Sequence, residues 1–179
     1  MIDKKIYNTF EFSGALLVPG FSIYLLEVIK ENNKWFYIGM TGDPHYPSAR
    51  SAFHRLSGHL ELSKRSTQNQ LLLALKEKVG IKNEEDMDKL TFRMHFFAIP
   101  GFKKINDKAL DNETVNQLKK TEGYKEYKKI QSQVSILENA LIYELKGSLL
   151  NKTHGKIRHF DDLPFPEIYK NILELVNNE

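Results

Sequence analysis

Two apolar runs that flank a short polar stretch predict a hairpin near the start of the chain. Phe21–Lys30 reads FSIYLLEVIK and stays apolar on both faces over most of its length, which is typical of a central strand. The run ENNK predicts a turn, because Asn tolerates left-handed backbone. Trp35–Met40 (WFYIGM) then predicts the returning strand, with Glu31 opposite Lys34 across the turn.

Apolar residues at helical spacing predict four helices further along the chain. They cover Ser48–Leu60, Asn69–Gly80, Gln133–Gly147 and a stretch that begins near Pro166. Pro47 or Ser48 stands near the start of the first helix, and Gly80 ends the second. The clearest pattern is in the third helix, whose apolar stripe is Val134, Leu137, Leu141 and Leu145.

Two further segments lie between these helices. Leu90–Pro100 predicts a third strand, in which Thr91, Arg93 and His95 alternate with Phe92, Met94 and Phe96. One face of that strand is therefore expected to be more polar than the other. The following segment, Gly101–Lys129, is polar and rich in Lys, and it predicts a loop and a short helix inserted into the domain.

The order of these elements predicts an α+β domain. Strand, strand, helix, helix, strand, insert, helix and helix fit a small central antiparallel sheet of about three strands, flanked by helices. A length of 179 residues suits a single domain over the whole chain.

Composition adds an expectation about the compartment. The hydrophobic fraction of 41% and the charged fraction of 27% are ordinary for a globular protein. Cys is absent, which excludes disulfides and thiolate metal sites and fits a reducing compartment. No apolar run approaches the roughly 20 residues of a membrane span, and the first residues lack the apolar core of a signal peptide. We therefore expect a cytoplasmic protein with no membrane partner.

The charge distribution is more informative than the total. A formal net charge of +3 permits a nucleic-acid partner without demanding one. The insert concentrates Lys103, Lys104, Lys108, Lys119, Lys120, Lys125, Lys128 and Lys129. The alternative for each of these runs is a solvated surface of mixed charge.

Two tyrosines of the hairpin are candidates for chemistry. In the predicted pairing, Tyr24 lies opposite Thr41, which shares a face with Tyr37, so both hydroxyls point to one side of the sheet. The alternative is that both are core aromatics with satisfied hydroxyls. Gly39, inside the strand, indicates a place where something approaches the backbone closely.

The first predicted helix offers two pairs of Arg and His that are spaced four residues apart. They are Arg50 with His54 and Arg55 with His59, and either pair shares a helix face. The guanidinium fork suits phosphate, and His exchanges a proton near neutral pH. The alternative is an exposed helix face with scattered polar groups.

Glu138 and Asn151 are candidates in the last part of the predicted core. At helical spacing Glu138 neighbours Val134, Leu141 and Ile142, which places its carboxylate at the edge of the buried stripe. A carboxylate there needs a cation or several donors, and a structural Lys or Arg would serve as well as a metal. Asn151 follows the helix, where Asn is commonly a cap or turn residue.

Taken in order, these residues resemble the GIY-YIG nuclease superfamily. Its two strand motifs stand here as SIY (Ser22–Tyr24) and YIG (Tyr37–Gly39). The Arg and His of its first helix are matched by RLSGHL (Arg55–Leu60), its metal-binding Glu by LENALI with Glu138, and its Asn by LLN with Asn151.

The resemblance covers a core of about residues 21–152. It leaves a Lys-rich insert at about residues 101–130 and a C-terminal extension at 153–179, with its helix. Two departures concern the motifs: Ser22 replaces the first Gly of the name, and the stretch from YIG to the helix Arg is longer than the family's. This longer stretch leaves the Arg50/His54 pair open as an alternative, whereas Leu56 favours the Arg55/His59 pair.

The resemblance implies a metal-dependent endonuclease that hydrolyses phosphodiester bonds in DNA. It implies that Glu138 binds Mg²⁺ or Mn²⁺, that Arg55 stabilises the phosphoryl charge, and that Tyr37 is the general base. His59 would then orient or deprotonate Tyr37, and Tyr24 would position water or phosphate, although either Tyr remains open as the base. A free Tyr has a pKa of about 10, so neighbours must lower the pKa of that base.

The substrate-binding residues expected from the sequence are Gly39, Asn151, Lys103 and Lys104. A homodimer or a partner protein remains open as a source of specificity. The main alternative is a catalytically inactive nucleic-acid-binding module on the same scaffold, and an unrelated protein-binding domain is a third hypothesis.

Overall fold

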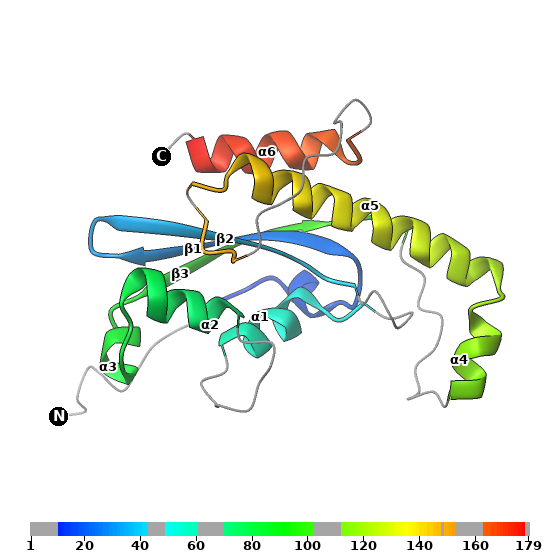
Figure 1. Ribbon diagram of the computed structural model, residues 1–179, viewed down its shortest axis with the longest axis horizontal. Coiled ribbons are helices and arrows are strands. Elements are labelled where there is room, and N and C mark those ends of the chain that lie inside the picture. Colours follow the sequence, from blue (N-terminus) through cyan, green and yellow to red (C-terminus); the bar gives the residue numbers. More distant parts are fainter. Residues whose placement is uncertain are drawn as a thin grey trace.

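The sheet is built on the hairpin that the sequence predicts. In the computed structural model, which describes residues 11–42, 49–60, 70–101, 112–147, 149–152 and 163–177, strands β1 (Ser22–Lys30) and β2 (Asn33–Met40) pair antiparallel. Strand β3 (Thr91–Ala98) pairs antiparallel with the other edge of β1, giving the order β2-β1-β3. The predicted α+β class, with a three-stranded antiparallel sheet flanked by helices, is confirmed (Figure 1).

The predicted register of the hairpin was wrong by two residues. Lys30 pairs with Asn33, so the turn consists of residues 31 and 32, and Glu31 takes the left-handed conformation with φ 55°. Tyr24 consequently lies opposite Gly39 and not opposite Thr41. Side chains alternate with a period of two, so this shift leaves every residue on its predicted face.

Three helical elements follow one another on one side of the sheet. Helix α1 (Ala52–Leu60) begins later than predicted, because the Ser51 side chain accepts a hydrogen bond from the His54 backbone N–H at 3.2 Å and caps it. Helix α2 (Gln70–Ala74) continues into the π-helical turn η3 (Leu75–Val79), which ends as predicted at Gly80 with φ 77°.

Two short elements were missed in the sequence. One is the 3₁₀ turn η2 (Gly14–Leu17), and the other is helix α3 (Glu84–Met87) before β3. The Asn83 side chain caps α3 by accepting a hydrogen bond from the Asp86 backbone N–H at 2.9 Å.

Helices α5 and α6 cover the opposite side of the sheet (Figure 1). Helix α6 (Pro166–Asn177) begins at Pro166 as predicted. Helix α5 (Glu122–Glu144) begins well before the predicted Gln133, so residues 125–129, which the sequence assigned to the insert of a loop and a short helix, belong to this long helix. The short α4 (Asn112–Leu118) precedes it, at the end of α5 that extends past the sheet (Figure 1).

The sheet separates two apolar clusters. Ile23, Leu25 and Ile38 pack with α5 and α6 on one face. Tyr24, Leu26 and Val28 pack with α2 and η3 on the other. β1 is buried on both faces because it is the central strand, which is why its sequence shows no alternation.

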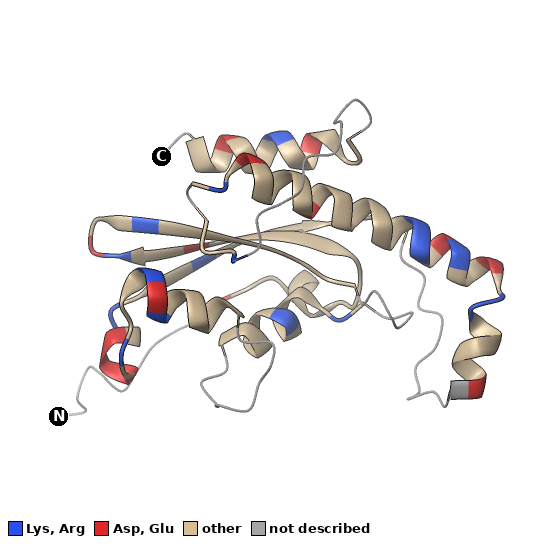
Figure 2. Cartoon of the chain, viewed as in Figure 1, with Lys and Arg blue, Asp and Glu red and all other residues tan. Residues whose placement is uncertain are grey.

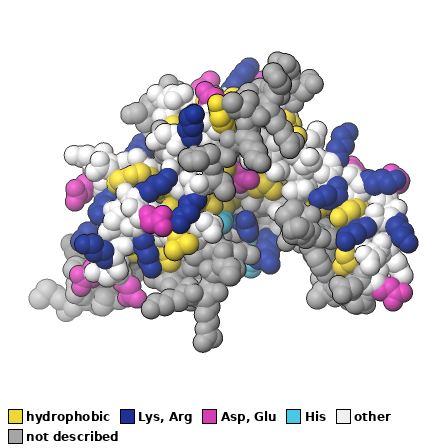
Figure 3. Space-filling model, viewed as in Figure 1, with side chains coloured by type: hydrophobic (Ala, Val, Ile, Leu, Met, Phe, Trp, Pro, Cys, Tyr) yellow, Lys and Arg dark blue, Asp and Glu magenta, His cyan; other side chains and the backbone are white. Residues whose placement is uncertain are grey.

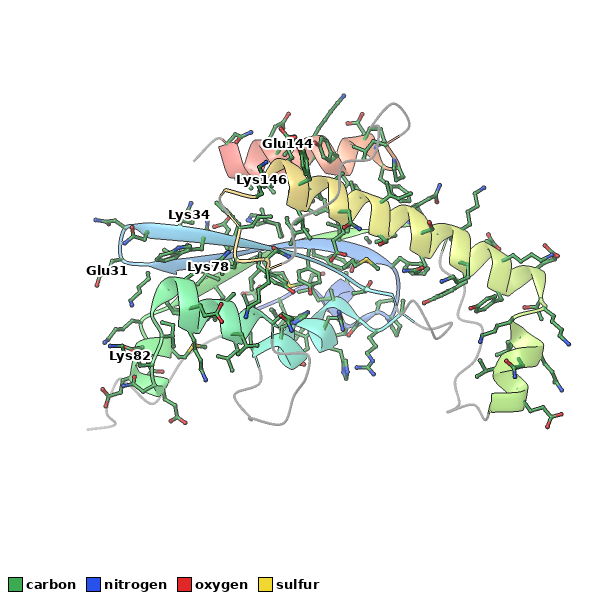
Figure 4. All side chains as sticks on the ribbon, viewed as in Figure 1. Glu31, Lys34, Lys78, Lys82, Glu144 and Lys146 are labelled. Atoms are coloured by element: carbon green, nitrogen blue, oxygen red, sulfur yellow. The ribbon has the colours of Figure 1, made fainter. Side chains whose placement is uncertain are left out.

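The segment after α5 lies beside the outer edge of β2. Leu149 forms a parallel bridge with Phe36, and the Leu150 backbone N–H donates to the Phe36 carbonyl at 2.6 Å. The Lys78 ammonium of η3 donates to the Leu149 carbonyl at 2.7 Å and so connects this segment to η3 (Figure 4). Within the described ranges, no helix is both long enough and apolar enough to cross a membrane.

Candidate active site

Tyr24 and Tyr37 share the sheet face that α2 covers. Tyr24 has no exposed surface, and Tyr37 is 8% exposed. Both side chains belong to one apolar cluster, so the expectation of a shared face is met despite the shifted register.

Gly39 makes room for the ring of Tyr24. The two residues are directly opposite, and a Cβ on Gly39 would lie 2.3 Å from both Cζ and Oη of Tyr24. The close approach expected at this glycine is therefore made by a side chain of the protein itself. In this arrangement Gly39 positions Tyr24.

The two Arg–His pairs of the helix region have different surroundings. Arg50 and His54 are exposed, and their side chains contact each other at 3.3 Å. His59 is buried, and its ring lies edge-on to Tyr37 with 5.5 Å between the centroids. Arg55 is half-buried, and its charge acts on Tyr24 and Tyr37. The structure thus brings the Arg55/His59 pair to the tyrosines and leaves the other pair on the surface.

Helix α5 carries Glu138 to the end of β2. Burial raises the pKa of Glu138 from 4.5 to about 7. The charge of Arg55 opposes this rise, as does a hydrogen bond from the Met40 backbone N–H to the carboxylate. The buried-edge position inferred from the sequence therefore has both a cation and a donor nearby, and burial still dominates.

The tyrosines are held in their protonated forms. Burial raises the pKa of Tyr37 to about 12, with the Glu138 charge adding to the rise and Arg55 opposing it. Burial also raises the pKa of Tyr24 far above 10.0, again against the charge of Arg55. The lowered pKa that a general base requires is therefore not produced by the described side chains alone.

The Tyr24 hydroxyl is a buried polar group with no hydrogen-bond partner of good geometry in the described part of the chain. Both the charge of Arg55 and a weak side-chain hydrogen bond from it favour the phenolate. A buried hydroxyl without a partner costs free energy, and such groups mark strained or ligand-binding places.

Asn151 binds the backbone of β2. Its Oδ1 accepts from the Ile38 N–H at 2.9 Å, and its Nδ2 donates to the Ile38 carbonyl at 2.8 Å. The side chain thus pairs with Ile38 as a neighbouring strand would. The observed contacts of Asn151 are therefore structural, and they join the segment after α5 to β2.

The structure also contains a polar cluster that sequence reasoning missed. Glu27 is fully buried on the sheet face away from the tyrosines, and it accepts from Arg93 at 2.9 Å and contacts His95 Nε2 at 2.5 Å. The signal was present, because a lone carboxylate interrupts an apolar strand and the polar residues of β3 alternate. Lys103 and Lys104 lie outside the described residues, as does Lys108.

The donor set fits a hard divalent cation. Tyr24, Tyr37 and Glu138 become anionic on ionisation, and Arg55 is the cation that acts on all three. In the described ranges no three His, Cys, Asp or Glu side chains form a cluster, so Glu138 would be a single carboxylate ligand. Mg²⁺ accepts this arrangement, since it commonly binds one or two carboxylates and keeps several waters.

Comparisons of the chain with protein-family models, curated proteins and solved structures found no match.

Proposed function

We propose that the chain is a divalent-metal-dependent endonuclease that hydrolyses phosphodiester bonds in DNA on a GIY-YIG-like scaffold. The observation that carries the proposal is the convergence of Tyr24, Tyr37, Arg55 and Glu138. They come from β1, β2, α1 and α5, four separate elements of the chain. Their order along the sequence is the order in which the resembled superfamily carries its motifs.

Arg55 is suited to the phosphate. Its guanidinium is permanently charged, and it lies half-buried among groups that are neutral at pH 7 or close to it. In such a setting it can stabilise negative charge on phosphoryl oxygens more strongly than it would in water. His59 packs against Tyr37, and in this role it orients the Tyr37 ring.

Glu138 is the residue that would hold Mg²⁺ or Mn²⁺. Bound there, the cation would neutralise phosphate charge and activate water. At pH 7 a carboxyl whose pKa burial raises to about 7 is only about half ionised, and positive charge added nearby would complete its ionisation. The buried Tyr24 hydroxyl, which interacts with Arg55, can donate a hydrogen bond to a phosphate oxygen or a water.

With a pKa of about 12, Tyr37 is protonated at neutral pH. It can therefore donate a proton but cannot accept one. It becomes a base only where added positive charge offsets its burial and the Glu138 charge. The proposal therefore couples any base function of Tyr37 to occupancy of the Glu138 site.

The test is nicking of supercoiled plasmid with Mg²⁺ or Mn²⁺ in three proteins. We expect cleavage by the wild-type chain, its loss with EDTA, and its loss in Glu138→Gln. The matched control is Glu144→Gln, because Glu144 lies exposed on the same helix (Figure 4).

The outcomes separate the hypotheses. Undiminished cleavage by Glu138→Gln would remove Glu138 from the reaction. DNA binding without cleavage under any divalent cation would favour the inactive binding module. A chain that neither binds nor cuts DNA would refute both.

A further inference from the structure

Helix α5 bears a polar stripe that ends at Glu138. The stripe consists of Tyr124, Lys128, Gln131 and Ser135, at alternating intervals of four and three residues that continue to Glu138. These residues lie within about 80° of Glu138 around the axis, at about 3.6 residues per turn. The stripe borders the buried face of α5, in which Tyr127 and Val134 lie.

The stripe residues are held in place by neighbouring side chains. Gln131 is buried, and its Oε1 accepts from the Lys128 ammonium at 3.2 Å. The ring of Tyr124 stacks on Tyr127 at 6.3 Å, and Tyr127 packs in turn on Phe21 of the core at 5.0 Å. These contacts connect Tyr124 and Lys128 to buried residues of the domain.

Charge is divided unequally around the helix. Glu122 and Glu126 both lie more than about 100° from Glu138, and Glu122 pairs with Lys125 at 2.5 Å. Lys129 lies about 180° from Glu138, on the far side. Between its start and Glu138, the stripe thus carries one charged group, the Lys128 ammonium, and no carboxylate.

The positive charge continues beyond the start of α5. Lys119 and Lys120 are exposed in the connection from α4. Figure 2 shows cations at this end of α5, and Figure 3 shows cationic side chains gathered over the same end of the molecule. α4 lies on the side of the sheet that α1 occupies, which is the side of the tyrosines (Figure 1).

We infer that this stripe binds the phosphate backbone of the DNA strand that leads away from the scissile phosphate. The inference rests on the proposed function. Lys, Ser and Tyr side chains are typical phosphate-binding groups, and the buried Gln131 positions the Lys128 ammonium. The ten residues from Lys128 to Glu138 span about 15 Å of helix. At about 3.4 Å per nucleotide along one strand, Lys128 contacts the backbone about four nucleotides from the bond that is cut.

The first test is the salt dependence of duplex binding, measured without divalent cation so that the DNA stays intact. Losing one phosphate contact lowers the slope of log affinity against log salt by about 0.9. Lys128→Gln should show this change, and its deficit should shrink as salt rises. Lys129→Gln removes the same charge from the far face, so it should leave the slope unchanged.

The second test locates the contact. The chain has no Cys, so Lys128→Cys and Lys129→Cys each introduce a single thiol. DNA carrying a thiol tether on one phosphate is offered to each variant, with the tether at different distances from the cleaved bond. We expect disulfide crosslinking of Lys128→Cys to peak at about four nucleotides, and little crosslinking of Lys129→Cys at any distance.

The two proposals fail in different ways. Equal slopes for Lys128→Gln and Lys129→Gln, or equal crosslinking of the two Cys variants, would overturn the stripe even if the protein cuts DNA. Binding with the expected slopes but without cleavage would overturn the endonuclease proposal and leave the stripe standing. Preference for RNA over DNA of the same sequence would overturn the assignment of the partner.

Discussion

At the residue scale, the two Arg side chains of the α1 region give the sharpest contrast. Arg55 acts on Tyr24, Tyr37 and Glu138, whereas Arg50 is exposed and contacts His54. We predict that Arg55→Gln lowers kcat for DNA cleavage by about a hundredfold or more, as is typical for loss of a preorganised charge-stabilising donor. Arg50→Gln should change kcat little, and the reverse ranking in single-turnover assays would assign the reaction to Arg50.

Glu138 makes the stability of the protein depend on pH. Its folded-state pKa is raised to about 7, so the folded state binds the proton more tightly than the unfolded chain. The contribution to stability is then full below the ordinary pKa of 4.5 and is lost as pH rises through about 7. We predict that the free energy of unfolding falls between pH 5 and about 8, and that Glu138→Gln reduces this fall.

Denaturant titrations at several pH values, without divalent cation, measure this effect. Glu144→Gln serves as the control, since Glu144 is exposed. An identical pH profile for Glu138→Gln and the wild type would contradict the raised pKa.

Gly39 is required by the ring it faces. A methyl group there would lie 2.3 Å from Tyr24, which cannot move freely because it is fully buried. We predict that Gly39→Ala lowers the free energy of unfolding by about 1–3 kcal/mol, as overpacking does. Gly58→Ala is the matched control, because a Cβ there meets nothing within 4 Å and Ala favours the helix. Chemical denaturation of both variants checks the contrast.

Sequence reasoning selected candidate residues that lie together in the fold, but not all of their partners. The edge position of Glu138 followed from helical spacing, because that spacing depends on local geometry alone. The Ile38 backbone as partner of Asn151 could not be foreseen, since the two are far apart in sequence and the contact depends on how the chain returns to the sheet.

At the scale of elements, the hairpin shows what an apolar pattern can and cannot determine. The pattern indicated which face each residue occupies, and that prediction survives a shift of two residues. It could not decide between a turn at Asn32 and Asn33 and the observed turn at Glu31 and Asn32. The left-handed Glu31 is uncommon for its type, so local preference pointed to the wrong turn.

The start of α5 was missed for a related reason. Its first turns lack buried apolar residues before Tyr127, because they extend past the sheet. The spacing of apolar residues indicates which residues are buried, so it could not predict the exposed first turns of α5. The cap was readable, since Thr121 accepts a hydrogen bond from the Tyr124 backbone N–H at 3.2 Å.

The Asn151 side chain supplies two of the hydrogen bonds that pair segment 149–152 with β2. Asn151→Ala removes both hydrogen bonds to Ile38. We predict a loss of about 1–3 kcal/mol in the free energy of unfolding, the usual cost of leaving backbone groups without partners. Asn139→Ala is the control, because Asn139 is exposed and bonds to the carbonyl of Ser135 in its own helix. Faster hydrogen exchange at the Ile38 amide in Asn151→Ala alone would locate the effect.

At the scale of the whole molecule, the proposed site exists only when four elements have assembled. Tyr24 and Tyr37 are placed by the hairpin, Arg55 by the packing of α1 against the sheet, and Glu138 by the position of α5 at the end of β2. The sequence could predict the list of residues from its motifs. The raised pKa values required the assembled burial, which no linear pattern contains.

The Lys-rich insert is tested best on the intact protein. Lys103, Lys104 and Lys108 lie outside the described residues, and the expectation that they contact DNA comes from the sequence. We predict that replacing all three with Gln weakens binding similarly for all DNA sequences and lowers the salt slope by nearly three. The matched control is a triple Gln variant of Lys76, Lys82 and Lys89, which are exposed elsewhere. Unchanged affinity and slope in the insert variant would identify a solvated loop.

The pairing of Asn151 and Leu149 with β2 also bears on self-association. β2 is the outer strand of the sheet, and its Trp35–Met40 run carries no charge. An outer strand of this kind is a template for strands from other copies, and apolar, uncharged windows are the ones that aggregate. The segment after α5 occupies that edge with hydrogen bonds at Phe36 and Ile38. The loop that follows the helix of Glu138 therefore also shields the hairpin from the strands of other copies.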